Sequence, residues 1–304
     1  MSKDKRLAVL LVGFGGPESI DQVPAFVESV LGRRPPDHVL VSVTDRYRAI
    51  GGGSPLPATT RRQAALVGEE LTRRGIKADV NVGMLHARPT IEEAADRMVA
   101  AGVKDLSVIS LAPYRCEVST DAYEAAVEKA LNGKGPRLHF ASDWNLATGY
   151  VRALADMLAQ SLEEAPADTP VIFAAHSLPE RMIEQGDPYA DQLLATAGTV
   201  AAEIGLRDWH LAYQSVSAAA REPWLGPSVD QVMERLAADG ANSVLIDPIG
   251  FISDHVETLY DNDIEHRAHA KALGLDFYRC RCLNHHSGLI DALADLVETT
   301  ADHD

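Results

Sequence analysis

Residues 91–113, IEEAADRMVAAGVKDLSVISLAP, contain the unit from which the rest of the chain is built. Apolar residues recur at helical spacing over Ile91–Ala101, Gly102 interrupts that pattern, and Leu106–Leu111 is a short apolar run typical of a buried strand. Strands of about five or six residues that alternate with longer helices predict βαβ units and parallel sheets, so we predict an α/β, doubly wound fold. The other expected strands are Leu7–Val12, Asp79–Met84, Arg137–Ala141, Val171–Ala175, His210–Tyr213 and Ser243–Ile246.

The helix–glycine–strand order occurs again in the second half of the chain. Arg235-Leu-Ala-Ala-Asp-Gly240 leads into a strand that ends at Pro248, as Arg97-Met-Val-Ala-Ala-Gly102 leads into one that ends at Pro113. Either the chain has two related α/β halves, or this order is simply the general form of a βαβ unit. Glu163–Pro170 is polar, carries proline and lies near the middle of the chain. We therefore predict two domains, residues 1–165 and 166–304, with the last helix free to pack back on the first domain.

The charge balance of the 304 residues excludes several classes of partner. Lys and Arg number 28 against 44 Asp and Glu, a net charge of −16, which disfavours nucleic acid and anionic membrane surfaces. Three cysteines are too few for a disulfide framework, and no apolar run is long enough to span a membrane. We expect a cytoplasmic protein with no stable membrane anchoring. An anionic substrate would need a local basic patch.

Two glycine-rich turns are candidate ligand contacts. Gly13-Phe14-Gly15-Gly16-Pro17 follows a strand, but Glu18 stands where a dinucleotide fingerprint needs its third glycine. Ile50–Pro57 has no G-K-[ST] and is not a Walker A loop. These turns let the backbone approach a flat ligand, with Phe14 facing it and with Ser54 and the nearby arginines as contacts for its anionic groups. The alternative is that they are ordinary surface loops.

A histidine and three carboxylates are candidate chemical groups. His176 follows the strand Val171–Ala175, where α/β folds place their chemistry, and its surroundings lack the G-x-S-x-G of a serine hydrolase. Glu257, Asp261 and Glu265 are four residues apart, so on a helix they share one face. That face is either solvated or a track for a cation, and the strand and turn before it favour a site. Alone, His176 could equally be structural.

Cysteines and histidines near the C-terminus suggest a metal or an iron–sulfur cluster. Cys280 and Cys282 precede Asn284-His285-His286, and Cys116 is the remaining thiol. An ordinary cluster needs four cysteines, so the alternative is a polar lead-in to a last helix over Gly288–Thr300.

Several motifs, taken together and in order, resemble those of the ferrochelatases over nearly the whole chain. The resemblance implies two similar Rossmann-like domains, each a parallel sheet flanked by helices, with a porphyrin cleft between them. It implies a lyase that inserts Fe2+ into a porphyrin with release of two protons, without an organic cofactor. The motifs are Gly13-Phe-Gly-Gly-Pro-Glu18, Tyr47-Arg-Ala-Ile-Gly-Gly-Gly-Ser-Pro-Leu56, Ala175-His-Ser-Leu-Pro-Glu180, Tyr213-Gln-Ser215, Pro223-Trp-Leu-Gly-Pro227 and Pro248-Ile-Gly-Phe-Ile-Ser-Asp-His-Val-Glu-Thr-Leu-Tyr260.

The same resemblance assigns roles to single residues. His176 and Glu257 match the catalytic pair, as proton acceptors or as iron ligands. Asp261 and Glu265 continue the carboxylate ladder as a metal route or an outer metal site, with His86 as a partner. The expected porphyrin-binding residues are Phe14, Arg46, Ser54 and Tyr123, with Phe14 on the opposite face of the ring from His176.

Departures from the family pattern refine these expectations. Phe14 replaces a tyrosine that binds iron in some relatives, and Val30–Pro35 lacks the apolar lip of membrane-associated forms. A [2Fe–2S] cluster on Cys116, Cys280 and Cys282 would need a fourth ligand and is not favoured. We predict a monomer that metallates coproporphyrin III, because a polar, arginine-bearing cleft suits four propionates. The alternatives are protoporphyrin IX as substrate, a cobalt or nickel chelatase, and a porphyrin or haem carrier without activity.

Overall fold

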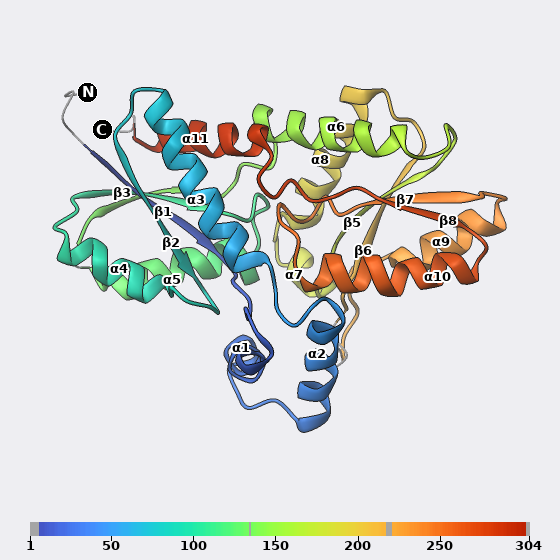
Figure 1. The fold of residues 1–304 in the computed structure, drawn as a ribbon, viewed down its shortest axis with the longest axis horizontal. Coiled ribbons are helices and arrows are strands. Elements are labelled where there is room, and N and C mark those ends of the chain that lie inside the picture. The colour runs from blue at the N-terminus through green and yellow to red at the C-terminus, as the bar shows by residue number, and fades with distance from the viewer. Residues whose placement is uncertain (1–5, 134, 217–220, 302–304) are drawn as a thin grey trace. The chain divides into compact units, whose positions relative to one another are not determined.

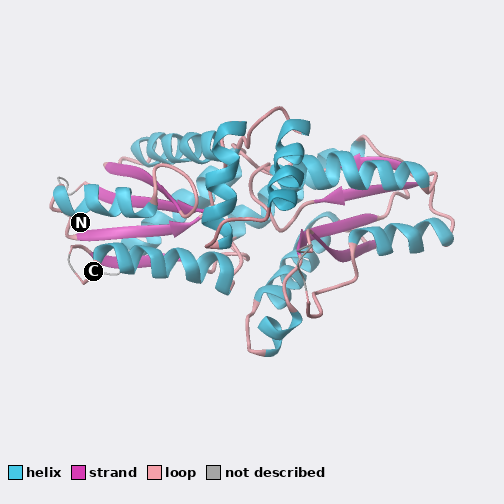
Figure 2. Ribbon diagram, turned by 90° about the horizontal axis from the view of Figure 1, so that it is seen from below, coloured by secondary structure: helices cyan, strands magenta, loops and turns pink. Residues whose placement is uncertain are grey.

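The computed structural model describes residues 6–133, 135–216 and 221–301. Contacts divide the chain into two compact units: unit 1 is Met1–Trp144 with Asn284–Asp304, and unit 2 is Asn145–Leu283. Each unit contains a four-stranded sheet in which all strand pairs are parallel. Helices cover both faces of each sheet (Figure 2). The predicted α/β class is therefore confirmed.

Unit 1 has the strand order β2-β1-β3-β4. The middle strands β1 (Leu7–Gly13) and β3 (Asp105–Ser110) are almost wholly buried, which is why they read as apolar runs. The edge strands are β2 (Ala78–Met84) and β4 (Arg137–Ala141). Helices α4 (Ile91–Ala100) and α5 (Ala122–Leu131) pack on one face through a core that includes Leu10 and Val108. Its other helical segments are η1 (Ile20–Gln22), α1 (Val23–Leu31), α2 (Asp37–Ala49), α3 (Leu56–Arg73), η2 (Glu117–Asp121) and α11 (Ser287–Ala301).

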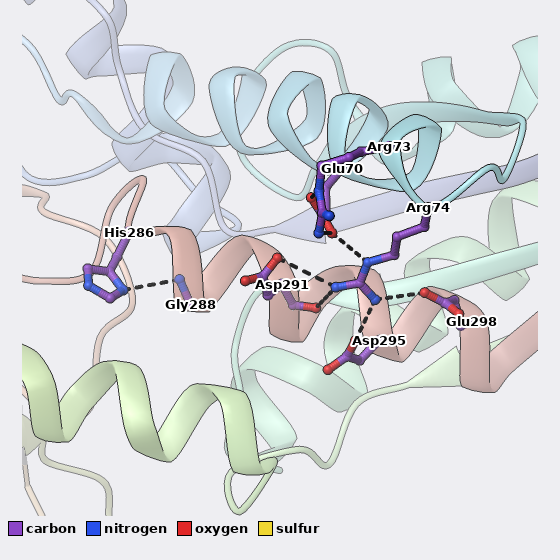
Figure 3. Close-up of polar contacts among 8 residues, drawn as sticks. All are labelled: Glu70, Arg73, Arg74, His286, Gly288, Asp291, Asp295 and Glu298. Carbon is purple, nitrogen blue, oxygen red and sulfur yellow. Dashed lines mark hydrogen bonds and ion pairs between the residues drawn. The ribbon is translucent and has the colours of Figure 1, made fainter.

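One arginine holds the last helix, α11, against α3 within unit 1 (Figure 3). Arg74 lies directly after α3, and its Nη1 donates to Asp295 Oδ1 at 2.5 Å and to Glu298 Oε1 at 2.7 Å. Its Nε donates to Glu70 Oε1 at 2.6 Å. Because carboxylates of both helices share this guanidinium, their mutual repulsion is offset and the C-terminal segment is returned to unit 1.

Unit 2 has the strand order β6-β5-β7-β8, with β5 (Val171–His176) and β7 (Ser243–Asp247) in the middle. The edge strands are β6 (Trp209–Gln214) and β8 (Asp276–Arg279). Its core joins both middle strands to α9 (Val229–Ala238) and α10 (Arg267–Ala272). The helical segments are α6 (Thr148–Glu163), α7 (Glu180–Glu184), α8 (Tyr189–Ile204), α9 (Val229–Ala238), η3 (Glu257–His266) and α10 (Arg267–Ala272).

The two units have the same strand order and the same local devices. The helix before the third strand starts with a capping box in both, Thr90 with Glu93 at α4 and Ser228 with Gln231 at α9. A glycine with positive φ follows each of these helices, Gly102 at 67° and Gly240 at 94°. The repeated helix–glycine–strand pattern therefore marks two related halves.

The structure corrects two expectations about local structure. The residues from Glu257 to Glu265 lie in a π-helix, η3, which continues into α10 as one helix (Figure 1), rather than in an ordinary α-helix. A second π-helical segment, η2, precedes α5 in unit 1. The short strand β8 was not predicted, because Asp276–Arg279 begins and ends with a charged residue and shows no apolar run.

The domain boundary also differs from the predicted one. α6 packs against α8, so it belongs to unit 2, and the boundary falls at Trp144 and Asn145 rather than at residue 165. The polar segment 163–170 is the connection from α6 to β5 inside unit 2. Among the described residues, no helix combines the length and apolar character needed to cross a membrane.

Candidate active site

The end of β5 fixes the backbone around His176. Ser177 N donates to Gln214 O at 2.8 Å, and Gly250 N donates to Ala174 O at 3.1 Å. His176 Nδ1 lies 2.5 Å from Ser177 O. Because a carbonyl oxygen only accepts, this contact places the ring proton on Nδ1 and leaves a lone pair on Nε2 in the neutral imidazole.

Glu257, the first residue of η3, lies between two imidazoles. Its Oε1 is 3.6 Å from His176 Nε2, and its Oε2 is 3.7 Å from His255 Nε2. The side chains of His176 and Glu257 are 32% and 27% exposed, so the pair is accessible from solvent. Two imidazole nitrogens thus lie close to the two oxygens of one carboxylate, an arrangement that can take up and pass on protons.

His255 is the more enclosed of the two histidines. Its Nδ1 lies 3.2 Å from Ser253 O, which again places the proton on Nδ1 and turns Nε2 toward Glu257. Burial lowers the pKa of His255, but the hydrogen bond and negative charge of Glu257 outweigh it, so that the pKa lies above its ordinary value. His255 therefore tends to hold a proton beside the carboxylate.

The carboxylate ladder changes environment along η3. Asp261 is buried, and its Oδ2 accepts a 2.5 Å hydrogen bond from Ser215 Oγ, while Glu265 is exposed. Ser215 follows β6 with a φ of 62°, a left-handed conformation that a serine adopts at a cost. Gln214 Nε2 donates to Glu257 O at 3.0 Å. The end of β6 therefore holds the turns of η3 that carry Glu257 and Asp261.

In unit 1 the two glycine-rich turns touch. Ser54 N donates to Pro17 O at 2.7 Å, and a Cβ on Gly16 would lie 3.0 Å from that of Ser54. His86 N donates to Phe14 O at 2.9 Å, and the two rings lie edge to face with centroids 4.6 Å apart. Ser54, Phe14 and His86 therefore belong to one local cluster, in which Ser54 is buried.

An aromatic group extends this cluster. Phe26 of α1 packs edge to face on Phe14 at 6.3 Å and on Tyr47 of α2 at 6.2 Å. Arg46 is half-buried next to Tyr47 in the last turn of α2. His86 Nδ1 lies 2.9 Å from Ser29 Oγ, and burial lowers the pKa of the imidazole, which favours its neutral form.

Tyr123 and the three cysteines are buried. Tyr123 is 3% exposed in the core under α5, and burial raises the pKa of its hydroxyl. Cys116 is buried in unit 1, whereas Cys280 and Cys282 are buried in unit 2. Burial raises the pKa of the Cys280 and Cys282 thiols. Over the described residues, no three His, Cys, Asp or Glu side chains are arranged to hold a metal ion.

Comparison with known proteins identifies the family of this chain. The sequence model of the Ferrochelatase family matches residues 6–301. The chain belongs to the ferrochelatase family. It is 38% identical to the ferrochelatase of Deinococcus radiodurans over 310 residues, covering 99% of this chain and 98% of that one. It is 35% identical to the coproporphyrin III ferrochelatase of Anoxybacillus flavithermus over 306 residues, covering 98% and 96%. The resemblance seen in the motifs is therefore confirmed.

Solved structures agree on the fold alone. SirB of Bacillus subtilis with Fe3+ superposes with a TM-score of 0.64 at 14% identity, covering 98% of this chain and 96% of that one. CbiX, the terminal enzyme of sirohaem biosynthesis in denitrifying bacteria, gives a TM-score of 0.56 at 13% identity, covering 97% of this chain and 99% of that one.

Ferrochelatases are metal-inserting lyases that take a porphyrin and ferrous iron as substrates, so this family member is an enzyme, not an inactive carrier.

Two contact residues are not among the residues predicted from the sequence. His255 lies two residues before Glu257 and outside the four-residue spacing of the carboxylates. Ser215 ends the Tyr213-Gln-Ser215 motif, and only its contact with Asp261 shows what it holds. The signal in the sequence that could have identified His255 is its closeness to Glu257, and for Ser215 it is membership of that motif.

Proposed function

We propose that this ferrochelatase inserts Fe2+ into coproporphyrin III, forming coproheme III with release of two protons. The observation that carries the chemistry is the placement of His176 Nε2 and His255 Nε2 at the two oxygens of Glu257, 3.6 and 3.7 Å away. Support for the substrate comes from relatives named coproporphyrin III ferrochelatases, at 32 to 35% identity. The name of the Deinococcus relative specifies no porphyrin.

In this proposal His176 and Glu257 remove the pyrrole protons. The Nε2 lone pair of His176 accepts a proton from a pyrrole N–H, and the Glu257 carboxylate accepts or passes on a proton beside it. Two N–H bonds break, Fe2+ gains bonds to the ring nitrogens, and two protons leave to solvent. His255 stabilises the negative charge of Glu257 between turnovers.

In the same proposal, the carboxylates of η3 guide the metal to the porphyrin. Nitrogen and carboxylate ligands suit Fe2+, and the ladder runs from exposed Glu265 through buried Asp261 to Glu257. His86 stays a predicted partner in unit 1, and Phe14, Arg46 and Ser54 are the proposed porphyrin contacts. Tyr123 is left out of this set, because its side chain is enclosed in the core. We assign no step to the cysteines or to a cluster. Cytoplasmic location and a monomeric state stay predictions.

Steady-state rates of iron insertion into coproporphyrin III and protoporphyrin IX test the substrate. We expect a clear preference for coproporphyrin III; a preference for protoporphyrin IX would contradict the choice of porphyrin while leaving the site intact. Competition between Fe2+ and Co2+ in the same assay tests the cobalt alternative.

The site itself is tested with His176→Ala. We expect it to bind porphyrin, seen by the change in Soret absorption, and to lose metallation by about 10²-fold or more. Full activity of this variant would show that the proton acceptor lies elsewhere.

A further inference from the structure

We propose that Arg279 is a positioning residue for metal insertion, whose buried guanidinium ties both ends of the segment 254–263 to the sheet of unit 2 and so holds His255 and Glu257 opposite His176. The inference rests on the function proposed above and concerns a residue that does not itself touch the reacting groups. Its support comes from the contacts of Arg279 and of its two partners.

The sheet fixes the backbone of Arg279. It is the last residue of β8 and pairs in register with Ile246 of β7. The next residue, Cys280, donates its N–H to Ile246 O at 2.8 Å. The side chain of Arg279 is only 9% exposed. The guanidinium therefore starts from a rigid strand and lies in a place where its charge needs partners.

The guanidinium binds one carboxylate on each side of the catalytic residues. Its Nε donates to Asp263 Oδ1 at 2.7 Å, and its Nη1 donates to Asp254 Oδ1 at 3.1 Å. Asp254 precedes η3, and Asp263 lies in its later part. Because one planar group makes both contacts, the separation of the two carboxylates is set by the arginine.

From Asp254 the constraint passes directly to the catalytic turn. Thr258 Oγ1 donates to Asp254 Oδ1 at 3.1 Å and accepts from His255 N at 3.0 Å. Thr258 is fully buried and adjacent to Glu257. A shift of Asp254 would therefore move Thr258, and with it the backbone that aims His255 and Glu257.

The contacts of Arg279 with Asp254 and Asp263 favour positioning of η3 over added stability as their main effect. A buried ion pair contributes little net stability relative to apolar residues of similar size, because desolvation offsets the attraction. A π-helix is a rare conformation with wider turns, and it needs tertiary contacts to persist. Ser215 holds η3 from the β6 side at Asp261, and Arg279 holds it from the β8 side at Asp263.

The test compares Arg279→Lys, Asp263→Asn and the control Arg267→Met. Lysine keeps the charge but cannot span both carboxylates with a planar fork. Arg267 also contacts Asp263, at 3.6 Å, but its side chain is 52% exposed and lies on the helix itself. The three variants thus separate the bridge from the charge beside Asp263.

For Arg279→Lys we expect kcat for iron insertion to fall by about 10²-fold while the porphyrin KM stays within about two-fold. Asp263→Asn should give a smaller fall in kcat, about ten-fold, and Arg267→Met should stay within about two-fold of the parent enzyme. Thermal midpoints show whether each variant is folded at the assay temperature. Asp263→Asn carries the test if Arg279→Lys does not fold, because Asp263 is the more exposed partner.

Retention of kcat within about two-fold by the folded bridge variants would overturn the proposal, as would an equal loss in Arg267→Met. His176→Ala, measured in parallel, separates this failure from that of the proposed function. If His176→Ala is fully active, the site assignment fails; if it is inactive while the bridge variants are unchanged, only the role of Arg279 fails.

Discussion

The π-helical segments of the two units begin with the same acidic pattern and end in different chemistry. Glu117 and Asp121 of η2 correspond in spacing to Glu257 and Asp261 of η3. Two residues before the glutamate, unit 1 has Arg115, whereas unit 2 has His255. Arg115 Nη2 pairs with Asp121 Oδ1 at 2.9 Å, so in unit 1 this carboxylate is neutralised by a permanent cation.

In unit 2 the position of Arg115 is taken by His255, whose imidazole can gain or lose a proton. His255 and His176 both face Glu257, and Asp261 accepts from the neutral hydroxyl of Ser215. A guanidinium cannot release its proton near neutral pH, but an imidazole can. The duplicated scaffold supplies carboxylates in both halves, and in the proposed function the imidazoles adapt one of the two sets to proton transfer.

Glu257→Gln should have the largest effect on this difference. We expect the rate of iron insertion to fall by about 10²–10⁴-fold, because the amide keeps the shape but neither accepts a proton nor attracts a cation. The matched change in unit 1, Glu117→Gln, should leave the rate within about two-fold, since Glu117 is exposed at the start of η2. Comparable losses in both variants would show that the two segments contribute alike.

Glu257→Gln should also lower the pKa of His255, because the carboxylate raises it in the native chain. A raised histidine pKa adds stability that is fully present below the ordinary value of about 6.5 and is lost as pH rises through the higher, folded-state value. The stability gap between parent and variant should therefore shrink as pH rises above 7. Histidine NMR titration of the metal-free protein follows the pKa directly, and an unchanged His255 titration would contradict the proposed pairing.

Gly250→Ala should show how closely the loop after β7 approaches His176. The new Cβ would lie 2.7 Å from Ala175 Cβ and 2.8 Å from its Cα, directly before His176. We expect a loss of about 1–3 kcal/mol in the free energy of unfolding, with a fall in kcat as Ala175 shifts. Gly198→Ala in α8 is the matched control, because nothing lies within 4 Å of its Cβ position. That control should gain about 0.5–1 kcal/mol. Denaturant unfolding and initial rates measure both changes, and equal effects would contradict the packing argument.

The sequence predicts the repeated scaffold better than the details that make the site. Apolar runs such as Val171–Ala175 identify strands because they are buried on both faces. By contrast, nothing in residues 257–266 distinguishes a π-helix from an α-helix, and the side chains that contact this segment, Ser215 and Arg279, come from other elements of unit 2. The boundary was misplaced because a polar connection inside a domain resembles a linker. Pairing of His176 with Glu257 followed from family motifs, not from spacing.

Asp247→Asn should reveal a pH dependence that arises in unit 2. Asp247 ends β7, is 3% exposed, and burial raises its pKa to about 7. A raised carboxyl pKa means that the folded state resists ionisation, so stability falls as pH rises from about 4 toward 7. The amide does not ionise, so the stability of Asp247→Asn relative to the parent should rise by about 2–3 kcal/mol from pH 5 to pH 8. Denaturant unfolding at both pH values measures this, and a gap independent of pH would contradict it.

Ser215 gives the smallest expected effect and separates backbone strain from hydrogen bonding. Its φ of 62° costs a serine or an alanine about 1–2 kcal/mol, whereas glycine adopts it freely. Ser215→Ala and Ser215→Gly both lose the hydrogen bond to Asp261, so both should lower kcat. Only Ser215→Ala keeps the strain, and it should unfold about 1 kcal/mol more easily than Ser215→Gly. In unit 1, Asn132 at the end of α5 also has a positive φ, of 46°. Asn132→Gly should leave kcat unchanged, because there the left-handed residue ends a helix and holds no reactive carboxylate. If Ser215→Gly retains full kcat, the contact with Asp261 is dispensable, and the conformation of Ser215 reflects the turn alone.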